Sequence, residues 1–238
     1  MKRVSVTLSA NAGIAIHFGG KRIWVDALLD EKEPGFSTLS PQLQQKMLQC
    51  EAFQGPDIIC ATHCHPDHYS RKLMQSAKCL WPQAKLLLPE PEFSDQTLIS
   101  GDRFCFDEPG IALEFIRLPH EGAQYAQVKH YGLIMHVEGK HILIAGDCAT
   151  ASPVLAQALQ SVSIDLAILN FPWITLAKGR DFLTKVLKPK HLLIGHLPFE
   201  EDDTSGYRQS ALRNAKLLKE QFDLRLLWNP LQTETIEI

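Results

Sequence analysis

A short run of metal-ligand side chains dominates the sequence at residues 62–69, Thr-His-Cys-His-Pro-Asp-His-Tyr. Three imidazoles and one carboxylate lie within six consecutive positions, at His63, His65, Asp67 and His68. In an extended segment alternate side chains project to the same side, so we expect His63 and His65 to reach one cation. The intervening proline stiffens the turn that presents Asp67 and His68. The pattern therefore predicts two adjacent metal positions.

This run follows a short apolar strand, residues 58–61, and has the order His-x-His-x-Asp-His. Both features resemble the metallo-β-lactamase fold superfamily, and the resemblance spans the whole chain. Within that pattern His120, Asp147 and His196 match the later ligand positions, each just after an expected strand. The resemblance implies two ligand sets bridged by Asp147: His63, His65 and His120 for one metal, and Asp67, His68 and His196 for the other.

Further polar residues lie near this expected site. His130 is the alternative to His120 as the third histidine, and its position near a strand start also makes it a candidate substrate contact. Asn11, Asp26, Asn170 and Trp173 lie at expected strand ends or loops on the side where the ligands emerge. We expect them to line the substrate pocket, because loops at such ends carry function. Turn and packing roles are the alternative.

The donor set predicts the chemistry. It contains nitrogen and oxygen atoms without a thiolate, which suits Zn²⁺ as the first expectation and Mn²⁺ or Fe as alternatives. Water shared by two such cations loses its proton near neutral pH, which supplies a nucleophile for hydrolysis without a serine or cysteine. Asp67 is the expected catalytic residue, because its carboxylate is placed to orient this nucleophile and manage its proton.

The segment Leu8–Ile14, the Gly-Gly turn and Asp26 resemble the compact branch that includes ascorbate-6-phosphate lactonase-like and tRNase Z-like proteins. This resemblance implies a metal-dependent hydrolase of an ester-type bond, a phosphodiester or a lactone, in a small molecule. A tRNase Z-like ribonuclease and a glyoxalase-type thioesterase are the alternatives within the superfamily. A di-iron redox protein and a non-catalytic metal-binding module are the alternatives from other classes.

The composition of the sequence limits which binding partners and which cellular location we expect. The 238 residues carry 24 basic and 27 acidic side chains without a basic run, which makes nucleic acid an unfavoured partner. No apolar stretch of signal-peptide or membrane-spanning length occurs, and six cysteines lack paired spacing, so we expect a reduced cytoplasmic location and no membrane partner. Oligomeric state stays open, a homo-oligomer included.

The remaining pattern predicts the elements that position the site. Strands are expected first at 4–8, 13–18 and 22–26, then at 57–61 and 85–88, with helices at 40–53 and 70–78. A second block repeats this logic, with strands at 104–106, 112–118, 131–138, 141–145, 165–169 and 191–195. Helices are expected from Ser152, before Pro189 and at 204–222.

Two such blocks predict one α/β domain over residues 1–238, with two mixed β-sheets face to face and helices on the outer faces. This four-layer αββα sandwich is also what the resemblance to the metallo-β-lactamase fold implies.

Overall fold

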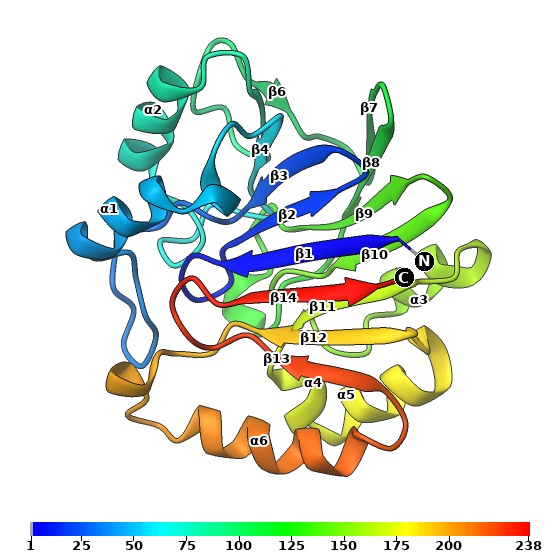
Figure 1. Cartoon of the computed structure of the whole chain (residues 1–238). Helices are drawn as coiled ribbons and strands as arrows, with labels where there is room; N and C mark the ends of the chain where they lie inside the picture. Colours follow the sequence, from blue (N-terminus) through cyan, green and yellow to red (C-terminus); the bar gives the residue numbers. More distant parts are fainter. Residues whose placement is uncertain (1) are drawn as a thin grey trace.

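The computed structural model, which describes residues 2–238, contains two seven-stranded β-sheets with helices outside them (Figure 1). The first sheet contains, from edge to edge, β14 (Thr233–Glu237), β1 (Arg3–Leu8), β2 (Ile14–Phe18), β3 (Lys21–Val25), β4 (Ile58–Cys60), β5 (Lys85–Leu88) and β6 (Thr97–Leu98). Pairing is antiparallel from β14 to β3 and parallel from β3 to β6. The pairing of β1 with β14 brings the two ends of the chain together (Figure 1).

The second sheet repeats the arrangement of the first. It contains, from edge to edge, β13 (Asp223–Leu226), β12 (His191–Gly195), β11 (Leu166–Asn170), β10 (Lys140–Ile144), β9 (Tyr131–Val137), β8 (Ile111–Arg117) and β7 (Arg103–Glu108). Pairing is antiparallel from β7 to β10 and parallel from β10 to β13. In both sheets, an antiparallel meander thus leads into parallel strands that need covering helices.

Helices cover the outer face of each sheet. Helices α1 (Pro41–Gln49) and α2 (Arg71–Leu80) pack on the first sheet, and α3 (Pro153–Ala158), α4 (Pro172–Thr175), α5 (Ala177–Phe182) and α6 (Tyr207–Leu218) pack on the second (Figure 1). The hydroxyl groups of Ser40 and Ser70 accept hydrogen bonds from the first turns of α1 and α2, as N-caps do. No helix among residues 2–238 is long and apolar enough to cross a bilayer.

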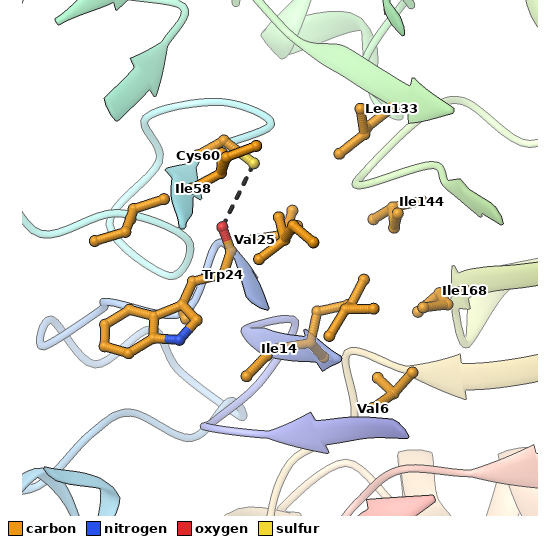
Figure 2. Packing of buried hydrophobic residues seen from close by; sticks show 14 of the residues in the cluster. Val6, Ile14, Trp24, Val25, Ile58, Cys60, Leu133, Ile144 and Ile168 are labelled. Atoms are coloured by element: carbon orange, nitrogen blue, oxygen red, sulfur yellow. Dashed lines mark hydrogen bonds between the residues drawn. The ribbon is translucent and has the colours of Figure 1, made fainter. Parts of the chain in front are cut away.

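Aliphatic side chains fill the space between the sheets. Figure 2 shows Ile14 and Val25 of the first sheet on one side and Leu133 and Ile144 of the second sheet on the other. All four side chains are buried. Removing such a side chain from water stabilises the fold by roughly 1.5–3 kcal/mol. The facing apolar rows hold the two sheets together, so the loops at their shared edge meet.

A second apolar layer lies between the first sheet and its helices. Trp24 on β3 is fully buried and packs edge-on against Phe53 and Trp81, with ring centroids 5.6 and 4.8 Å away. Its backbone oxygen accepts a hydrogen bond from the Cys60 thiol at 3.4 Å (Figure 2). The expected helix 40–53 is interrupted at Cys50, and a short 3-10 turn then carries Phe53 inward.

The structure confirms the αββα sandwich and corrects several element boundaries. The last helix, expected at 204–222, comprises Tyr207–Leu218. The helix expected before Pro189 consists of α4, α5 and a π-helical turn, Leu183–Leu187. Strands β6, β13 and β14 were not expected, because short edge strands carry too few buried side chains to show an apolar pattern.

Candidate metal centre

The candidate ligands emerge from one edge of the paired sheets. The loop 62–68 follows β4, His120 follows β8, Asp147 follows β10, and His196 follows β12. Strands β8 and β10 run in the same direction, because each pairs antiparallel with β9, and β10 runs parallel to β12 through β11. Ligand sites in α/β sheets form where the carboxyl ends of strands meet, and these seven side chains occupy that position.

One group of nitrogen donors consists of His63, His65 and His120, whose ligand atoms lie within 4.8 Å of one another. His63 Nε2 is 3.1 Å from His65 Nδ1. His120 Nε2 is buried and has no hydrogen-bond partner among the described residues. The structure thus groups the ligand atom of His120, and not that of His130, with those of the first two histidines of the loop.

The second group consists of Asp67, His68, Asp147 and His196, with ligand atoms within the same 4.8 Å limit. His68 Nε2 lies 3.2 Å from His196 Nε2 and 3.4 Å from Asp147 Oδ2. The other Asp147 oxygen is 3.4 Å from His196 Nε2. Asp147 Oδ2 is also 3.7 Å from His120 Nε2 in the first group, so this carboxylate lies between the two sets.

This donor set fits a pair of cations. His120 Nδ1 lies 2.8 Å from the Glu121 carbonyl oxygen, which can only accept, so Nδ1 carries the proton and Nε2 the lone pair. His68 is fixed in the same way, because Nδ1 faces the Asp26 carboxylate at 3.0 Å. Without a cation, His120 Nε2 is a buried acceptor with no partner, which is costly. A divalent cation in each group would accept the nitrogen and oxygen lone pairs that converge there.

The groups behind the ligands hold them in place. Asp26 accepts hydrogen bonds from the backbone N–H and the hydroxyl of Thr62, both at 2.7 Å, as well as from His68. The Thr62 hydroxyl in turn lies 3.0 Å from His63 Nδ1. Such outer contacts orient metal-binding imidazoles and select their tautomers. Asp26 therefore supports both ligand groups from below and does not face the cleft as a substrate contact would.

Two amides orient the two ligand carboxylates. Asn11 is fully buried, and its Nδ2 donates to the Asp67 backbone oxygen at 3.1 Å and to Asp67 Oδ2 at 3.2 Å. Asn170 Nδ2 donates to Asp147 Oδ1 at 3.3 Å, while its side chain also lines the cleft. The expectation of a pocket position thus applies to Asn170, whereas Asn11 lies beneath Asp67.

Three non-glycine residues at the site have left-handed backbone conformations. Asn11, Asp26 and His196 have φ angles of 54°, 52° and 54°. Asparagine, aspartate and histidine tolerate this region better than other residues, but it still costs free energy. The backbone N–H of His196 donates to the Asn11 carbonyl oxygen at 3.1 Å, which ties two of these loops together. These unfavourable backbone angles thus place His196 among the candidate ligands and Asn11 and Asp26 beneath them.

Charge pairing perturbs the pKa values of the second group. Burial lowers the pKa of His196, but the Asp147 charge and hydrogen bonds to Asp147 and Asp67 raise it to about 9. Burial raises the pKa of Asp67, yet its hydrogen bond to His196 and the charge of His68 lower it to about 2. Against the effect of burial, His196 and His68 also hold the pKa of Asp147 well below its usual range. Without a metal, positive imidazoles balance the carboxylates.

Two expected substrate contacts lie away from the cleft. Trp173 is fully buried in the core under α4 and α5, where it packs against Phe182 at 5.4 Å, because α4 turns its side chain inward. His130 is also fully buried, with Nδ1 3.2 Å from the Leu118 carbonyl oxygen and its ring 5.1 Å from that of His63. Burial lowers the pKa of His130 to about 3, so it is a neutral ring that packs behind the ligands.

A cleft of about 360 Å³ opens above the two ligand groups. Its lining consists of Glu33, Pro34, Phe36, His65, Pro66, Asp67, His120, Glu121, Tyr125, Asp147, Asn170, Phe171, Pro172 and His196. Sequence reasoning missed the rings of Phe36, Tyr125 and Phe171, which lie in loops or, for Tyr125, in a 3-10 turn too short to show periodicity. It also missed Glu121, although its position next to His120 was a signal. The Glu121 carboxylate accepts hydrogen bonds from the Thr150 N–H and hydroxyl at 2.7 and 2.9 Å.

The fold has counterparts among solved structures. The metallo hydrolase Igni18 from the archaeon Ignicoccus hospitalis is 14% identical over 99% of this chain and 99% of that chain, with a TM-score of 0.69. The metallo-β-lactamase fold protein YhfI from Bacillus subtilis is 12% identical over 99% and 100%, with a TM-score of 0.66. CmlA, a diiron β-hydroxylase from Streptomyces venezuelae, is 13% identical over 100% of this chain and 55% of that chain, with a TM-score of 0.67.

No family model matches the sequence, and no curated protein matches it. At these identities the similarity shows the fold. The chain has the metallo-β-lactamase fold, and because one fold can carry many functions, its chemistry depends on the residues of the site.

Proposed function

We propose that this protein is a hydrolase that uses two divalent cations to cleave an ester-type bond, a phosphodiester or a lactone, in a small molecule. The observation that carries the proposal is the convergence of seven side chains in two ligand groups with Asp147 between them. Five of these side chains line a cleft of about 360 Å³, which leaves room for a small substrate. Small-molecule hydrolysis fits this size better than nucleic acid processing.

The bound cations supply Lewis acidity and the positive charge that makes water nucleophilic at neutral pH. Asp67 is the catalytic carboxylate. Asn11 donates a hydrogen bond to its Oδ2 at 3.2 Å, and this contact orients the carboxylate so that it can accept a hydrogen bond from the attacking water. The water contributes a hydroxyl group to the carbonyl carbon or phosphorus, the ester bond breaks, and the second proton ends on the departing alcohol.

The native metal is proposed to be zinc. Five imidazoles and two carboxylates form the donor set, and Zn²⁺ accepts such nitrogen and oxygen ligands in hydrolytic sites. Manganese and iron accept the same donors, so these ions are the alternatives. Metal analysis of protein purified without chelators distinguishes them. A di-iron redox protein would contain two irons per chain and would show an optical spectrum that a zinc enzyme lacks.

The proposed activity is tested with zinc-loaded protein and a panel of lactone, phosphodiester and thioester substrates. We expect hydrolysis of at least one lactone or phosphodiester, and a loss of at least about hundredfold in kcat in Asp67→Asn and His65→Ala. The matched control is His191→Ala, which removes an imidazole whose Nδ1 pairs with Asp223 at 2.9 Å outside the site.

Three results contradict the proposal. One is the absence of turnover for every ester by protein that holds two zinc ions. Another is turnover that survives Asp67→Asn unchanged. The third is cleavage of thioesters alone, which would favour the thioesterase alternative.

A further inference from the structure

The rim of the cleft carries an acidic side chain from the loop after β3. Glu33 lines the cleft and is half-buried, and no basic side chain forms an ion pair with it among residues 2–238. Neither lysine nor arginine is among the residues that line this cleft. Lys178 lies beside it, but its Nζ contacts the Glu121 carboxylate at 2.9 Å. The rim therefore favours positive over negative substrate groups.

Aromatic rings flank the ligands on both sides. The Phe36 ring packs edge-on against the ligand His196, with centroids 4.8 Å apart, and stacks on Tyr207 at 5.7 Å. The Tyr125 ring lies 4.9 Å from His65 and 4.6 Å from His120. A substrate whose reacting bond is at the ligands would therefore touch aromatic faces on either side. Such faces bind apolar groups and attract cations.

The loop that carries Glu33 and Phe36 is held in place by contacts to the second half of the chain. The Asp202 carboxylate accepts hydrogen bonds from the Lys32 ammonium at 2.5 Å and from the Ser37 hydroxyl at 2.7 Å. Within the loop, the Phe36 backbone N–H donates to the Glu33 carbonyl oxygen at 3.0 Å. The backbone that carries Glu33 and Phe36 is thus fixed before a substrate enters, which lowers the entropic cost of binding.

We propose that the substrate of this site is an ester or lactone that carries a positively charged ammonium group next to an apolar group, and that Glu33 selects it. This proposal rests on the proposed hydrolase function, because the ligand groups hold the reacting bond. The ammonium group pairs with the Glu33 carboxylate and lies against the rings of Phe36 and Phe171, where a cation gains from the aromatic faces. A carboxylate or phosphate at the same place would meet Glu33 without a compensating cation.

The experiment measures binding with three matched chelating probes, so that it does not require turnover. The probes are 4-(aminomethyl)benzohydroxamate, 4-methylbenzohydroxamate and 4-carboxybenzohydroxamate, which share the metal-binding group and differ in charge. Dissociation constants are measured by calorimetry on protein loaded with two zinc ions. The tested variant is Glu33→Gln. Its matched control is Glu31→Gln, which removes the same charge from an exposed position of the same loop that does not line the cleft.

We expect the ammonium probe to bind at least about tenfold tighter than the carboxylate probe, with the neutral probe between them. In Glu33→Gln the ratio should fall to within about threefold, while Glu31→Gln keeps it. Equal binding of the charged probes, tighter binding of the carboxylate probe, or equal effects of both variants would overturn the proposal and leave the hydrolase function intact. Failure of all three probes on zinc-loaded protein, together with no ester turnover, would instead refute the hydrolase function and the substrate class with it.

Discussion

Replacing Asp26 with asparagine tests whether the ligands depend on the groups beneath them. The carboxylate is buried and accepts from the Thr62 N–H through Oδ1 and from the Thr62 hydroxyl and His68 Nδ1 through Oδ2. Asparagine keeps one accepting oxygen for the backbone N–H. Its NH₂ group then faces His68 Nδ1, so the proton that fixes the lone pair on Nε2 loses its acceptor.

The size of the effect follows from these contacts. Burial lowers the pKa of His68, and Asp147 and Asp26 together raise it well above its usual value, so the charge of Asp26 acts directly on this ring. Loss of an outer hydrogen bond to a metal-binding histidine weakens metal affinity by about 10–100-fold. Loss of the buried charged hydrogen bonds destabilises the metal-free fold by about 1–3 kcal/mol. In Asp26→Asn, zinc affinity should fall more at the proposed position of His68 than at that of His65.

The assay is a competitive zinc titration against a chromophoric chelator, with unfolding by urea measured in parallel. The control is Asp165→Asn. Asp165 is also buried and accepts from Lys190 at 2.6 Å and from the His141 N–H at 3.1 Å, far from the ligands in the fold. It should lose stability without losing zinc affinity. Zinc affinity within about threefold of wild type in Asp26→Asn, or an equal loss in Asp165→Asn, would refute this reasoning.

Other substitutions and conditions test separate parts of the structure. Gly146→Ala should lower the free energy of unfolding by about 1–3 kcal/mol, because φ is +55° and the new Cβ would lie 2.7 Å from His130 Nε2. The control is Gly20→Ala, whose new Cβ would have nothing within 4 Å and which should cost about 1 kcal/mol or less. Both free energies are measured by urea unfolding. Despite burial, Lys190 and the His141 N–H hold the pKa of Asp165 below its usual value. The contribution of Asp165 to stability is therefore full above the unfolded-state pKa of about 3.9, and it is lost as pH falls through the folded-state pKa. The stability difference between wild type and Asp165→Asn should therefore shrink between pH 5 and pH 3, as measured by urea unfolding at several pH values, and a constant difference would contradict it. Because the pKa of metal-free His196 is about 9, zinc binding at pH 7 should release protons and weaken as pH falls, which calorimetry in buffers of different ionisation enthalpy detects.

The convergence of the candidate ligands could be predicted because its signals are local. The loop 62–68 concentrates its ligands in a few residues, and the later ligands follow apolar strands that are easy to recognise, such as β12 before His196. The carboxyl ends of neighbouring parallel strands share an edge, so strand order alone brings such residues together. The sequence favoured His120 over His130 through its match to the superfamily pattern, and the coordinates group the His120 ligand atom with those of His63 and His65.

The roles of the residues around the ligands could not be predicted, because these roles depend on the direction of each side chain and on the conformation of loops. Trp173 follows a strand closely, yet α4 begins at Pro172 and turns the indole into the core. Asp26 was recognised as a polar residue at a strand end, but its left-handed backbone directs it beneath the ligands. Phe36 lies in a loop whose conformation depends on Asp202, far away in sequence. No periodic pattern encodes such contacts.

The most direct test of the proposed metal centre is the number of metal ions that the folded chain binds. Metal-free protein is dialysed against zinc, manganese or iron(II), and bound metal is then quantified by elemental analysis. The seven converging ligands predict two ions per chain, at least for zinc, and a loss of binding in His196→Ala and Asp147→Ala. Folded protein that binds none of these metals, or that binds two zinc ions as well without His196 and Asp147 as with them, would contradict the account.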